Sequence, residues 1–526
     1  MTVPEPSAFD PERPSFDGRF ESLIAAEPER VALILGDSEA SRGALLAAGR
    51  AFAALLHARG IGRGDVINVW LPDGAAWLQC LFGAAQLGVL VVPISTRYRR
   101  DEARHVVVTS RPKLLLVPEA FLTYDYAGEA RALCESIPVP PEVFVVDTQR
   151  GFIPVDPALA PAPYTGQPED PLCTFSTSGT TGLPKLAMHD QRGIAIHALT
   201  IAARAEVRVG DRMLCALSLY GVLGFNQAMA ALAGAAACVF LPVFKPQDAI
   251  DAMVRHRVTH YFGSDGLFAP VLEGAPARYD HWRFGGFAEF AGLGRAVVDQ
   301  AEQAHGTRLV AVYGSSECFA LMAMRSTEAP ASQRAVAGGT PVSPGIAFRV
   351  VDPVTRSPVG DRVQGELEVR GYNVMTGYVN NPQATAAVLD AEGWYTTGDL
   401  AYSEDGGMSF VYLARLKDSL RLHGYLVDPG EIEAFLCTHA DIAAAQVVGV
   451  NRPGEGDVAV AFVIARAGAV LDMAALTAWC RRGISGYKVP GRIVAVEAFP
   501  QTVGPNGTKI QKNRLREMAQ SVLAGL

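Results

Sequence analysis

Short apolar runs alternate with amphipathic stretches of helical spacing up to about residue 410 of the chain. The stretch 42–59 spaces its leucine side chains as a helix does, and 66–71 is typical of a strand. A second pair follows directly, with a helix over 75–87, a stop at Gly88 and an apolar run, 89–93, that suits a strand buried on both faces. Similar apolar runs recur at 114–117, 143–146 and 237–241. The alternation predicts an α/β fold of stacked layers with largely parallel or mixed sheets.

Shorter elements follow after about residue 412. We expect a helix over 429–439, a strand pair around Val447 and 458–464, and an exposed loop over 500–515 before a final helix. The chain is therefore expected to form a large N-terminal domain of layered sheets and helices and a small, mobile α+β C-terminal domain. A length of 526 residues agrees with at least two domains.

Composition excludes several classes of protein. Hydrophobic residues make up 49% and charged residues 19%, as in soluble globular enzymes, and a net charge of −8 disfavours a nucleic-acid partner. The 8 cysteines form no C-x-x-C pair, which argues against a zinc or disulfide framework and favours the cytoplasm. The N-terminus lacks the pattern of a signal peptide. The most apolar segment, 228–244, is too short to span a membrane and is expected to be a buried helix and strand; a homodimer is left open.

A loop rich in hydroxyl side chains and glycine, 176–185, directly follows the apolar run 172–175. Its N–H groups and hydroxyls can face an anion, and Lys185 adds a positive charge, so a nucleotide triphosphate is a fitting ligand. By composition alone, a Ser/Thr-Gly surface turn is an equal alternative. The spacing does not fit G-x-x-x-x-G-K-[ST], which disfavours an ordinary P-loop kinase or GTPase.

Four further stretches occur in order with this loop: Tyr313-Gly314-Ser315-Ser316-Glu317, 365–371, 393–400, and the pair 415–418 with 507–510. Together they resemble the adenylate-forming superfamily of acyl- and aryl-CoA synthetases, peptide-synthetase adenylation domains and beetle luciferases. The resemblance runs from about residue 20 to the C-terminus. It implies a carboxylate–CoA ligase, which converts ATP and a carboxylic acid on Mg²⁺ into acyl-AMP and pyrophosphate, and then transfers the acyl group to coenzyme A with release of AMP. Two alternatives are an acyl-AMP ligase that loads a separate carrier protein and an inactive binding or sensor protein of the same fold.

The resemblance also implies the site residues. Lys509, Glu317 and Lys185 would be catalytic, Lys509 at the α-phosphate and Glu317 on Mg²⁺; alone, Glu317 could be a solvated acid at a helix start. ATP would be bound by Thr177, Ser178, Gly179, Thr180, Thr181, Gly182, Lys185, Tyr313, Gly314, Ser316, Asp399 and Arg415. Gly424 would line the coenzyme A tunnel, with an ordinary turn glycine as the alternative. Lys417 would be the hinge, so that the domains are 1–414, a hinge at 415–417, and 418–526.

The acyl pocket is expected between Tyr220 and Cys318. Its residues by resemblance are Tyr220, Gly221, Phe225, Asp265, Gly285, Gly286, Phe287 and Ser315. Gly221 stands where the family usually has histidine, so either Tyr220 or a neighbour covers the site, or the cavity is larger. Asp265 either caps the helix that follows it or meets a polar group of the substrate. An aryl acid or a short to medium alicyclic or aliphatic acid fits these residues better than acetate does.

Overall fold

A computed structural model describes residues 21–148, 151–177, 184–275, 278–290, 292–418, 420–422, 425–427, 429–452, 456–484, 486–504 and 507–524. The chain divides into two compact units. The first comprises 1–347 with 369–395, and the second comprises 348–368 with 396–526. The hinge expected at 415–417 lies inside the second unit and stays a prediction about motion between two states.

The first unit contains a seven-stranded sheet in the order β18-β8-β7-β4-β3-β5-β6. Strands β7, β4, β3, β5 and β6 are parallel, whereas β8 and β18 are antiparallel to their neighbours. The bounds are β3 Val66–Val69, β4 Leu90–Pro93, β5 Leu114–Pro118, β6 Glu142–Val146, β7 Pro171–Ser176, β8 Leu186–Asp190 and β18 Gly377–Tyr378.

A second sheet of the first unit runs in the order β15-β14-β13-β12-β11-β9-β10-β1-β2. Strands β13, β12, β11, β9, β10 and β1 are parallel, and the strands at both ends of this series are antiparallel. The bounds are β1 Val31–Leu35, β2 Ser38–Ser41, β9 Arg212–Cys215, β10 Ala237–Phe240, β11 His260–Ser264, β12 Phe284–Ala288, β13 Val310–Tyr313, β14 Ala323–Met324 and β15 Gly338–Pro341.

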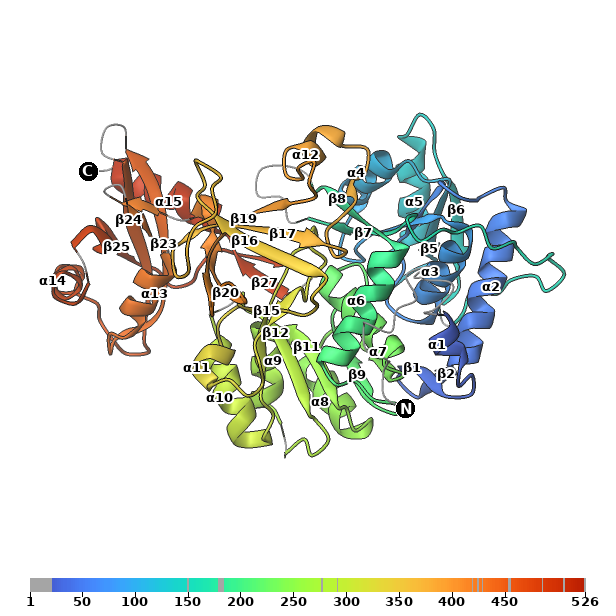
Figure 1. Cartoon of the computed structure of the whole chain (residues 1–526), viewed down its shortest axis with the longest axis horizontal. Helices are drawn as coiled ribbons and strands as arrows, with labels where there is room; N and C mark the ends of the chain where they lie inside the picture. The colour runs from blue at the N-terminus through green and yellow to red at the C-terminus, as the bar shows by residue number, and fades with distance from the viewer. Residues whose placement is uncertain are drawn as a thin grey trace. The chain divides into compact units, whose positions relative to one another are not determined.

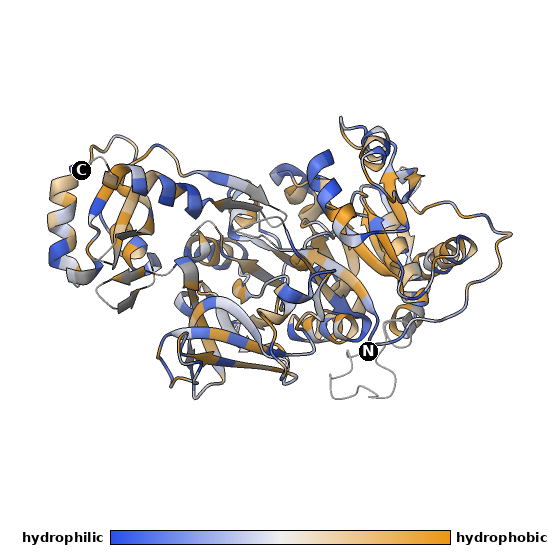
Figure 2. Cartoon of the chain, turned by 90° about the horizontal axis from the view of Figure 1, so that it is seen from above, coloured by the Kyte–Doolittle hydropathy of each residue, from blue (hydrophilic) through white to orange (hydrophobic). Residues whose placement is uncertain are grey.

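Helices fill the space between these sheets and cover their outer faces. One continuous core joins α2 (Arg42–Ala58), α3 (Ala75–Leu87), α6 (Gln191–Arg204) and α7 (Val222–Ala233) to the inner faces of both sheets. The outer faces carry α4 (Arg100–Ser110) and α5 (Tyr126–Glu135) on one sheet, and α8 (Pro246–Arg255), α9 (Asp265–Glu273) and α10 (Gly294–His305) on the other (Figure 1). Apolar residues are concentrated on the strands (Figure 2). The predicted layered α/β fold is therefore confirmed.

The second unit consists of smaller sheets. Its strands are β16 (Ile346–Val351), β17 (Gly365–Gly371), β19 (Tyr395–Glu404), β20 (Ser409–Arg415), β21 (Leu420–Leu422), β22 (Tyr425–Val427), β23 (Ile442–Arg452), β24 (Gly456–Ala465), β25 (Arg492–Ala495), β26 (Gln501–Gly504) and β27 (Gly507–Ile510); β16 and β17 each extend partly into the first unit. Helices α13 (Pro429–Cys437) and α14 (Met473–Gly483) pack on one face of β23-β24-β25, and α15 (Lys512–Ala524) packs on the other.

Several expected elements are confirmed and one is wrong. The helix over 75–87 is α3, which Gly88 ends with a left-handed backbone, φ +71°. The apolar segment 228–244 is the end of α7 followed by β10, and no helix in the described ranges is long and apolar enough to cross a membrane. The expected loop over 500–515 instead forms the antiparallel pair β26–β27, and α15 begins at Lys512. Glycine, proline and asparagine mark a reversal of the chain in the sequence, but composition alone does not distinguish a hairpin from a longer loop.

Candidate active site

The segment 178–183, which contains the predicted phosphate-binding residues from Ser178 to Gly182, lies outside the described residues, but its two ends are defined. The N–H of Thr177 donates to the carbonyl of Lys185 at 2.8 Å, and the N–H of Lys185 lies 3.3 Å from Oγ1 of Thr177. These bonds continue the β7–β8 pairing by one residue on each side. The base of the predicted loop is thus closed, and Lys185 is attached to a sheet strand.

Tyr378 brings two of the predicted residues together. Nζ of Lys185 lies 4.5 Å from the centre of the Tyr378 ring, a cation–π geometry. The Tyr378 hydroxyl donates to Oε1 of Glu317 at 3.0 Å. The sequence analysis missed Tyr378, because a Gly-Tyr dipeptide matches no functional pattern. Its role depends on the pairing of β18 with β8, which places the ring between a lysine and a carboxylate.

The residues before Glu317 lie at the carboxyl end of a parallel strand, where α/β sheets usually bind ligands. Tyr313 is the last residue of β13 and is buried. Gly314 follows with φ +158°, and a Cβ built on it would lie 2.4 Å from Cα of Ala320. The chain therefore folds back on itself so closely at Gly314 that a side chain has no room.

Serine hydroxyls tie this turn together. Oγ of Ser315 accepts the N–H groups of Glu317 and Cys318 at 3.2 and 3.3 Å. Oγ of Ser316 donates to the carbonyl of Ser176 at 3.1 Å, at the end of β7. The predicted phosphate loop and the turn that carries Glu317 are therefore bonded to each other directly.

After Glu317 the backbone enters an unusual conformation. Phe319, Ala320 and Leu321 have φ values of +63°, +43° and +45°, so three consecutive residues with side chains are left-handed. Each such residue costs about 1–2 kcal/mol, because its Cβ crowds the following carbonyl oxygen. Strain of this kind persists only where surrounding contacts determine the backbone, and it is concentrated at functional sites.

The donor set of this region suits magnesium rather than a metal held by a protein cage. No group of three or more His, Cys, Asp or Glu side chains that could hold a metal occurs among the described residues. Glu317 offers a half-buried carboxylate whose Oε1 accepts from Tyr378. Mg²⁺ commonly binds through one or two carboxylates together with substrate phosphates and waters, and one carboxylate beside a phosphate loop fits that pattern.

The two predicted ribose contacts face each other in the second unit. Asp399 on β19 and Arg415 on β20 are directly paired across the strands, and Nη1 of Arg415 lies 3.0 Å from Oδ1 of Asp399. Nη1 of Arg415 also lies 3.2 Å from the carbonyl of Thr397, whose Oγ1 accepts the N–H of Asp399 at 3.0 Å. Between them Gly398 takes φ +70°. The structure thus brings together two residues that are 16 positions apart in the sequence.

The predicted acyl residues at the start of α7 are held by a buried acid that the sequence analysis did not single out. Tyr220 is buried, and Gly221 is the residue that precedes the first turn of α7. Oδ1 of Asp73 accepts the N–H of Leu219 at 2.8 Å. Burial raises the pKa of Asp73 to about 7, against the opposing effect of this hydrogen bond. Asp73 therefore fixes the approach to Gly221.

The other predicted acyl residues are largely packed against protein atoms. Phe225 is fully buried, with its ring centre 5.1 Å from that of Phe175. A Cβ on Gly286 would lie 2.7 Å from the ring of Phe262, and one on Gly285 would lie 2.2 Å from Leu309. Phe287 is likewise buried. Close packing within the sheet accounts for the two glycines, and their role toward an acid stays a prediction.

The fully buried carboxylate of Asp265 accepts backbone N–H groups from two segments. Oδ1 accepts from Gly266 and Phe290 at 2.9 and 3.0 Å, and Oδ2 accepts from Leu293 at 2.9 Å. Ser264, rather than Asp265, occupies the position that caps α9. Asp265 therefore joins the start of α9 to the loop after β12, and its predicted contact with a polar group of the substrate stays a prediction. Burial, and to a lesser degree the nearby Asp265 carboxylate, raises the pKa of Glu289 to about 7.

The remaining predicted residues lie partly or wholly outside the described structure. Gly424 is not among the described residues, and the side chains of Lys417 and Lys509 are not described. The backbone of Lys509 is part of β27, paired with Thr502 on β26. Their predicted roles stay predictions.

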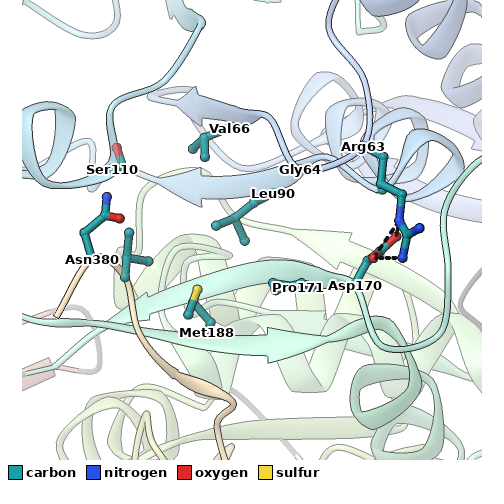
Figure 3. A pocket seen from close by; sticks show the side chains of 11 residues that line it. Arg63, Gly64, Val66, Leu90, Ser110, Asp170, Pro171, Met188 and Asn380 are labelled. Carbon is teal, nitrogen blue, oxygen red and sulfur yellow. Dashed lines mark hydrogen bonds and ion pairs between the residues drawn. The ribbon is translucent and has the colours of Figure 1, made fainter. Parts of the chain in front are cut away.

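A hollow of about 350 Å³ lies elsewhere in the first unit (Figure 3). It lies beside the first residues of β3, β4 and β7, at the end of these parallel strands opposite to Thr177. Val66, Leu90 and Met188 give it an apolar floor, and a bidentate ion pair of Arg63 with Asp170 lies at one side (Figure 3). None of the predicted site residues in the described ranges lines it. The hollow is therefore separate from the candidate active site.

Comparison with family models and curated relatives gives the same assignment over most of the chain. Residues 20–379 match the model of the AMP-binding enzymes, and 431–504 match the model of their C-terminal domain. One relative is the 3-[(3aS,4S,7aS)-7a-methyl-1,5-dioxo-octahydro-1H-inden-4-yl]propanoyl:CoA ligase of Mycobacterium tuberculosis, 30% identical, with 95% of this chain and 97% of the relative covered. The human mitochondrial medium-chain acyl-CoA ligase ACSF2 is 28% identical, with 88% of this chain and 80% of the relative covered.

Solved structures share the fold. ATP-bound MatB from Rhodopseudomonas palustris superposes with a TM-score of 0.84 at 23% identity, with 97% of this chain and 99% of that chain covered. A benzoate CoA ligase from Burkholderia xenovorans LB400 gives a TM-score of 0.80 at 23% identity, with 95% and 99% covered. At this level of identity the likeness supports the layered α/β architecture.

Proposed function

This chain belongs to the family of AMP-binding enzymes, and on that premise we propose that it is a carboxylate–CoA ligase. In the first step a carboxylate oxygen attacks the α-phosphorus of ATP, pyrophosphate leaves, and acyl-AMP forms. In the second step the sulfur of coenzyme A attacks the acyl carbon, the C–O bond to phosphate breaks, and AMP leaves. The predicted family and ligase class are confirmed by the family match and by relatives that are acyl-CoA ligases.

The observation that carries the proposal is the Lys185–Tyr378–Glu317 cluster at the base of the segment 178–183. A carboxylate that approaches a triphosphate meets like charge, so cations near the phosphates lower the barrier. Lys185 supplies one such charge, and its position over the Tyr378 ring directs it toward the turn that carries Glu317. Glu317 would hold Mg²⁺, which supplies charge neutralisation on the phosphate oxygens.

The second unit would provide the remaining contacts. Asp399 is an acceptor suited to the two ribose hydroxyls, and Arg415 orients it through their ion pair. We assign Lys509 to the α-phosphate during adenylation and Gly424 to the path of coenzyme A. Lys417 is the hinge about which the C-terminal part would turn between the two steps.

For the acid, we propose an apolar carboxylic acid of medium size, either alicyclic, aryl or aliphatic. The curated relatives include ligases for a bicyclic propanoyl acid and for medium-chain acids, and their coverage of this chain supports the proposal. A cytoplasmic location is proposed from the free cysteines, seven of them buried. A homodimer is part of the same proposal and is tested by measuring the mass of the enzyme in solution.

The test is a pyrophosphate-release assay with a panel of straight-chain, alicyclic and aryl acids, followed by mass spectrometry of the products. Coenzyme A and a holo carrier protein are offered separately as acceptors. We expect pyrophosphate with a subset of the acids and an acyl-CoA product. A carrier-bound product alone would move the assignment to an acyl-AMP ligase, and no pyrophosphate with any acid would identify a binding protein.

Matched lysine variants test the site itself. Lys185→Met should lower pyrophosphate release by about 10²-fold or more, because it removes a charge that stabilises the transition state. Lys113→Met is the control, since Lys113 is an exposed lysine whose Nζ lies 2.7 Å from Asp65. Equal activities for the two variants would contradict the proposed role of Lys185.

A further inference from the structure

Five consecutive backbone carbonyls, from Ser316 to Ala320, each accept a hydrogen bond from a donor outside this turn. Their donors are Nε2 of His189 to Ser316 at 2.8 Å, the N–H of Met375 to Glu317 at 2.8 Å, Nδ2 of Asn373 to Cys318 at 2.9 Å, Nδ2 of Asn226 to Phe319, and Nε2 of His197 to Ala320 at 2.9 Å. We call residues 316–320 the clamped turn. Backbone carbonyls are usually satisfied within helices and sheets, so an unbroken series of external donors is unusual.

Four of the five donors are side chains, and they come from four different segments. His189 lies on β8, His197 on α6 and Asn226 on α7, while Asn373 follows β17. Their exposed fractions are 2%, 0%, 1% and 0%, in that order. A buried imidazole or amide is costly unless it is hydrogen-bonded, and here each one bonds to a single carbonyl of the same turn. The four segments therefore converge on the clamped turn.

The two histidines act as neutral donors. A carbonyl can only accept, so Nε2 carries the proton in both rings. Burial lowers the pKa of His189 to about 3 and that of His197 to about 4. Both rings also pack on Phe319, with ring centres 4.2 and 5.1 Å away. The same side chains thus hold the turn by hydrogen bonds and by aromatic contact.

External holding explains how the left-handed backbone at Phe319, Ala320 and Leu321 persists. Three adjacent φ values above +40° give no regular hydrogen-bonded structure of their own, apart from the N–H of Ala320 bonded to the carbonyl of Ser315 at 2.8 Å. The conformation has to be imposed by neighbours. Glu317 lies inside the clamped turn, so its Cα position is fixed on both sides while its carboxylate remains half-buried at the surface of the site.

We propose that His189, His197, Asn226 and Asn373 are positioning residues for adenylation, which fix the clamped turn so that the Glu317 carboxylate is held ready for the magnesium ion of MgATP. The inference rests on the proposed function, since it assumes that Glu317 serves ATP. With exposed fractions of 0–2%, the four side chains are not accessible to a substrate. They act through the backbone, because any shift of the turn by a fraction of an ångström is passed directly to the carboxylate.

The test compares His197→Leu, which removes the donor, with His197→Gln, whose Nε2 can replace that of the ring. Asn226→Leu is a second variant of similar volume that removes another donor. Gln79→Leu is the matched control, because Nε2 of Gln79 is buried in the same unit and donates to the carbonyls of Ala48 and Ile153 at 3.2 and 3.1 Å, away from the clamped turn. Each variant is assayed for adenylation rate against Mg²⁺ concentration, for MgATP binding by calorimetry, and for its unfolding temperature.

We expect His197→Leu and Asn226→Leu to lower the adenylation rate by about 10–100-fold and to raise the Mg²⁺ concentration needed for half-maximal rate, as small misplacements of catalytic groups do. His197→Gln should recover most of the rate, and Gln79→Leu should lose stability only. The inference is overturned if His197→Leu and Gln79→Leu lower the unfolding temperature alike and leave the Mg²⁺ dependence unchanged. MgATP binding is measured without an acid, so it does not depend on which acid the enzyme uses. A wild-type enzyme that binds MgATP but adenylates no acid would contradict the proposed function, while MgATP binding by the variants would still test the positioning role.

Discussion

Gly314→Ala tests whether the close approach of two backbone segments holds the candidate active site together. At Gly314 the backbone has φ +158°, and a Cβ would lie 2.4 Å from Cα and 2.7 Å from the carbonyl carbon of Ala320. Real Cβ atoms do not approach backbone atoms this closely, so one of the two segments has to move. Ala320 cannot move freely, because its carbonyl accepts from His197 and its N–H donates to Ser315.

The expected cost has two parts. An alanine with strongly positive φ costs about 1–3 kcal/mol, and forcing a methyl group into a packed site costs about 1–3 kcal/mol more. We therefore expect Gly314→Ala to lower the free energy of unfolding by about 2–6 kcal/mol and to abolish most adenylation, since the displaced turn carries Glu317.

Gly60→Ala is the control that separates the two parts. Gly60 has φ +67° after α2, and nothing lies within 4 Å of a Cβ built there. It should lose only the backbone cost, about 1–2 kcal/mol, with adenylation unchanged. Urea unfolding and pyrophosphate release measure both effects. The reasoning is refuted if the free energies of unfolding of Gly314→Ala and Gly60→Ala agree within ~0.5 kcal/mol and Gly314→Ala keeps its activity. The close approach at Gly314 would then not hold the site together.

Two further predictions concern buried polar groups. The pKa values of His189 and His197 are about 3 and about 4 in the folded chain and about 6.5 when unfolded, so the unfolded state binds more protons between these values. The contribution of each neutral ring to the free energy of unfolding is therefore complete above pH 6.5 and falls by about 2 kcal/mol by pH 5. In urea unfolding, a His189→Gln/His197→Gln variant should lose about 4 kcal/mol less than the wild type between pH 8 and pH 5. Equal losses would contradict the assignment of neutral histidines. Gln227 is fully buried on α7, and neither of its amide atoms is hydrogen-bonded within the described structure. Gln227→Met, of similar shape, should therefore raise the free energy of unfolding by about 1–3 kcal/mol. A fall in the free energy of unfolding would show that the amide has a partner.

Local patterns predict the elements of this fold well where a physical signal marks the end of an element. The helix α3 is an example, because its apolar composition agrees with its burial and Gly88 stops it with a left-handed backbone. The region 500–515 is the opposite case. Glycine and proline mark a reversal of the chain there, but whether the flanking residues pair as β26 and β27 depends on cross-strand contacts that composition does not record.

The candidate site divides in the same way. Lys185, Glu317, Asp399 and Arg415 carry charges whose chemistry and order in the sequence point to a nucleotide, and the structure places them in pairs or clusters. Tyr378, Asp73 and the donors of the clamped turn were missed. A buried histidine or asparagine has no functional pattern in a single sequence, because its role is set by the carbonyl that it meets, more than 90 positions away in the case of Asn226 and Phe319.

The arrangement around Glu317 suggests why a left-handed turn is kept at this position. If Glu317 lay on a helix or strand, its backbone groups would be hydrogen-bonded within that element. The direction of its carboxylate would then be set by the axis of the element. On the clamped turn the five carbonyls are fixed by four segments of the first unit, so the carboxylate can face the phosphate loop while its backbone remains as constrained as that of a core strand. The strain of about 1–2 kcal/mol per left-handed residue is offset by hydrogen bonds to buried donors that would otherwise be unsatisfied. Removing one donor therefore leaves a carbonyl without its hydrogen bond and part of the backbone strain without an offset. For this reason the loss of a single hydrogen bond far from the substrate should lower the adenylation rate.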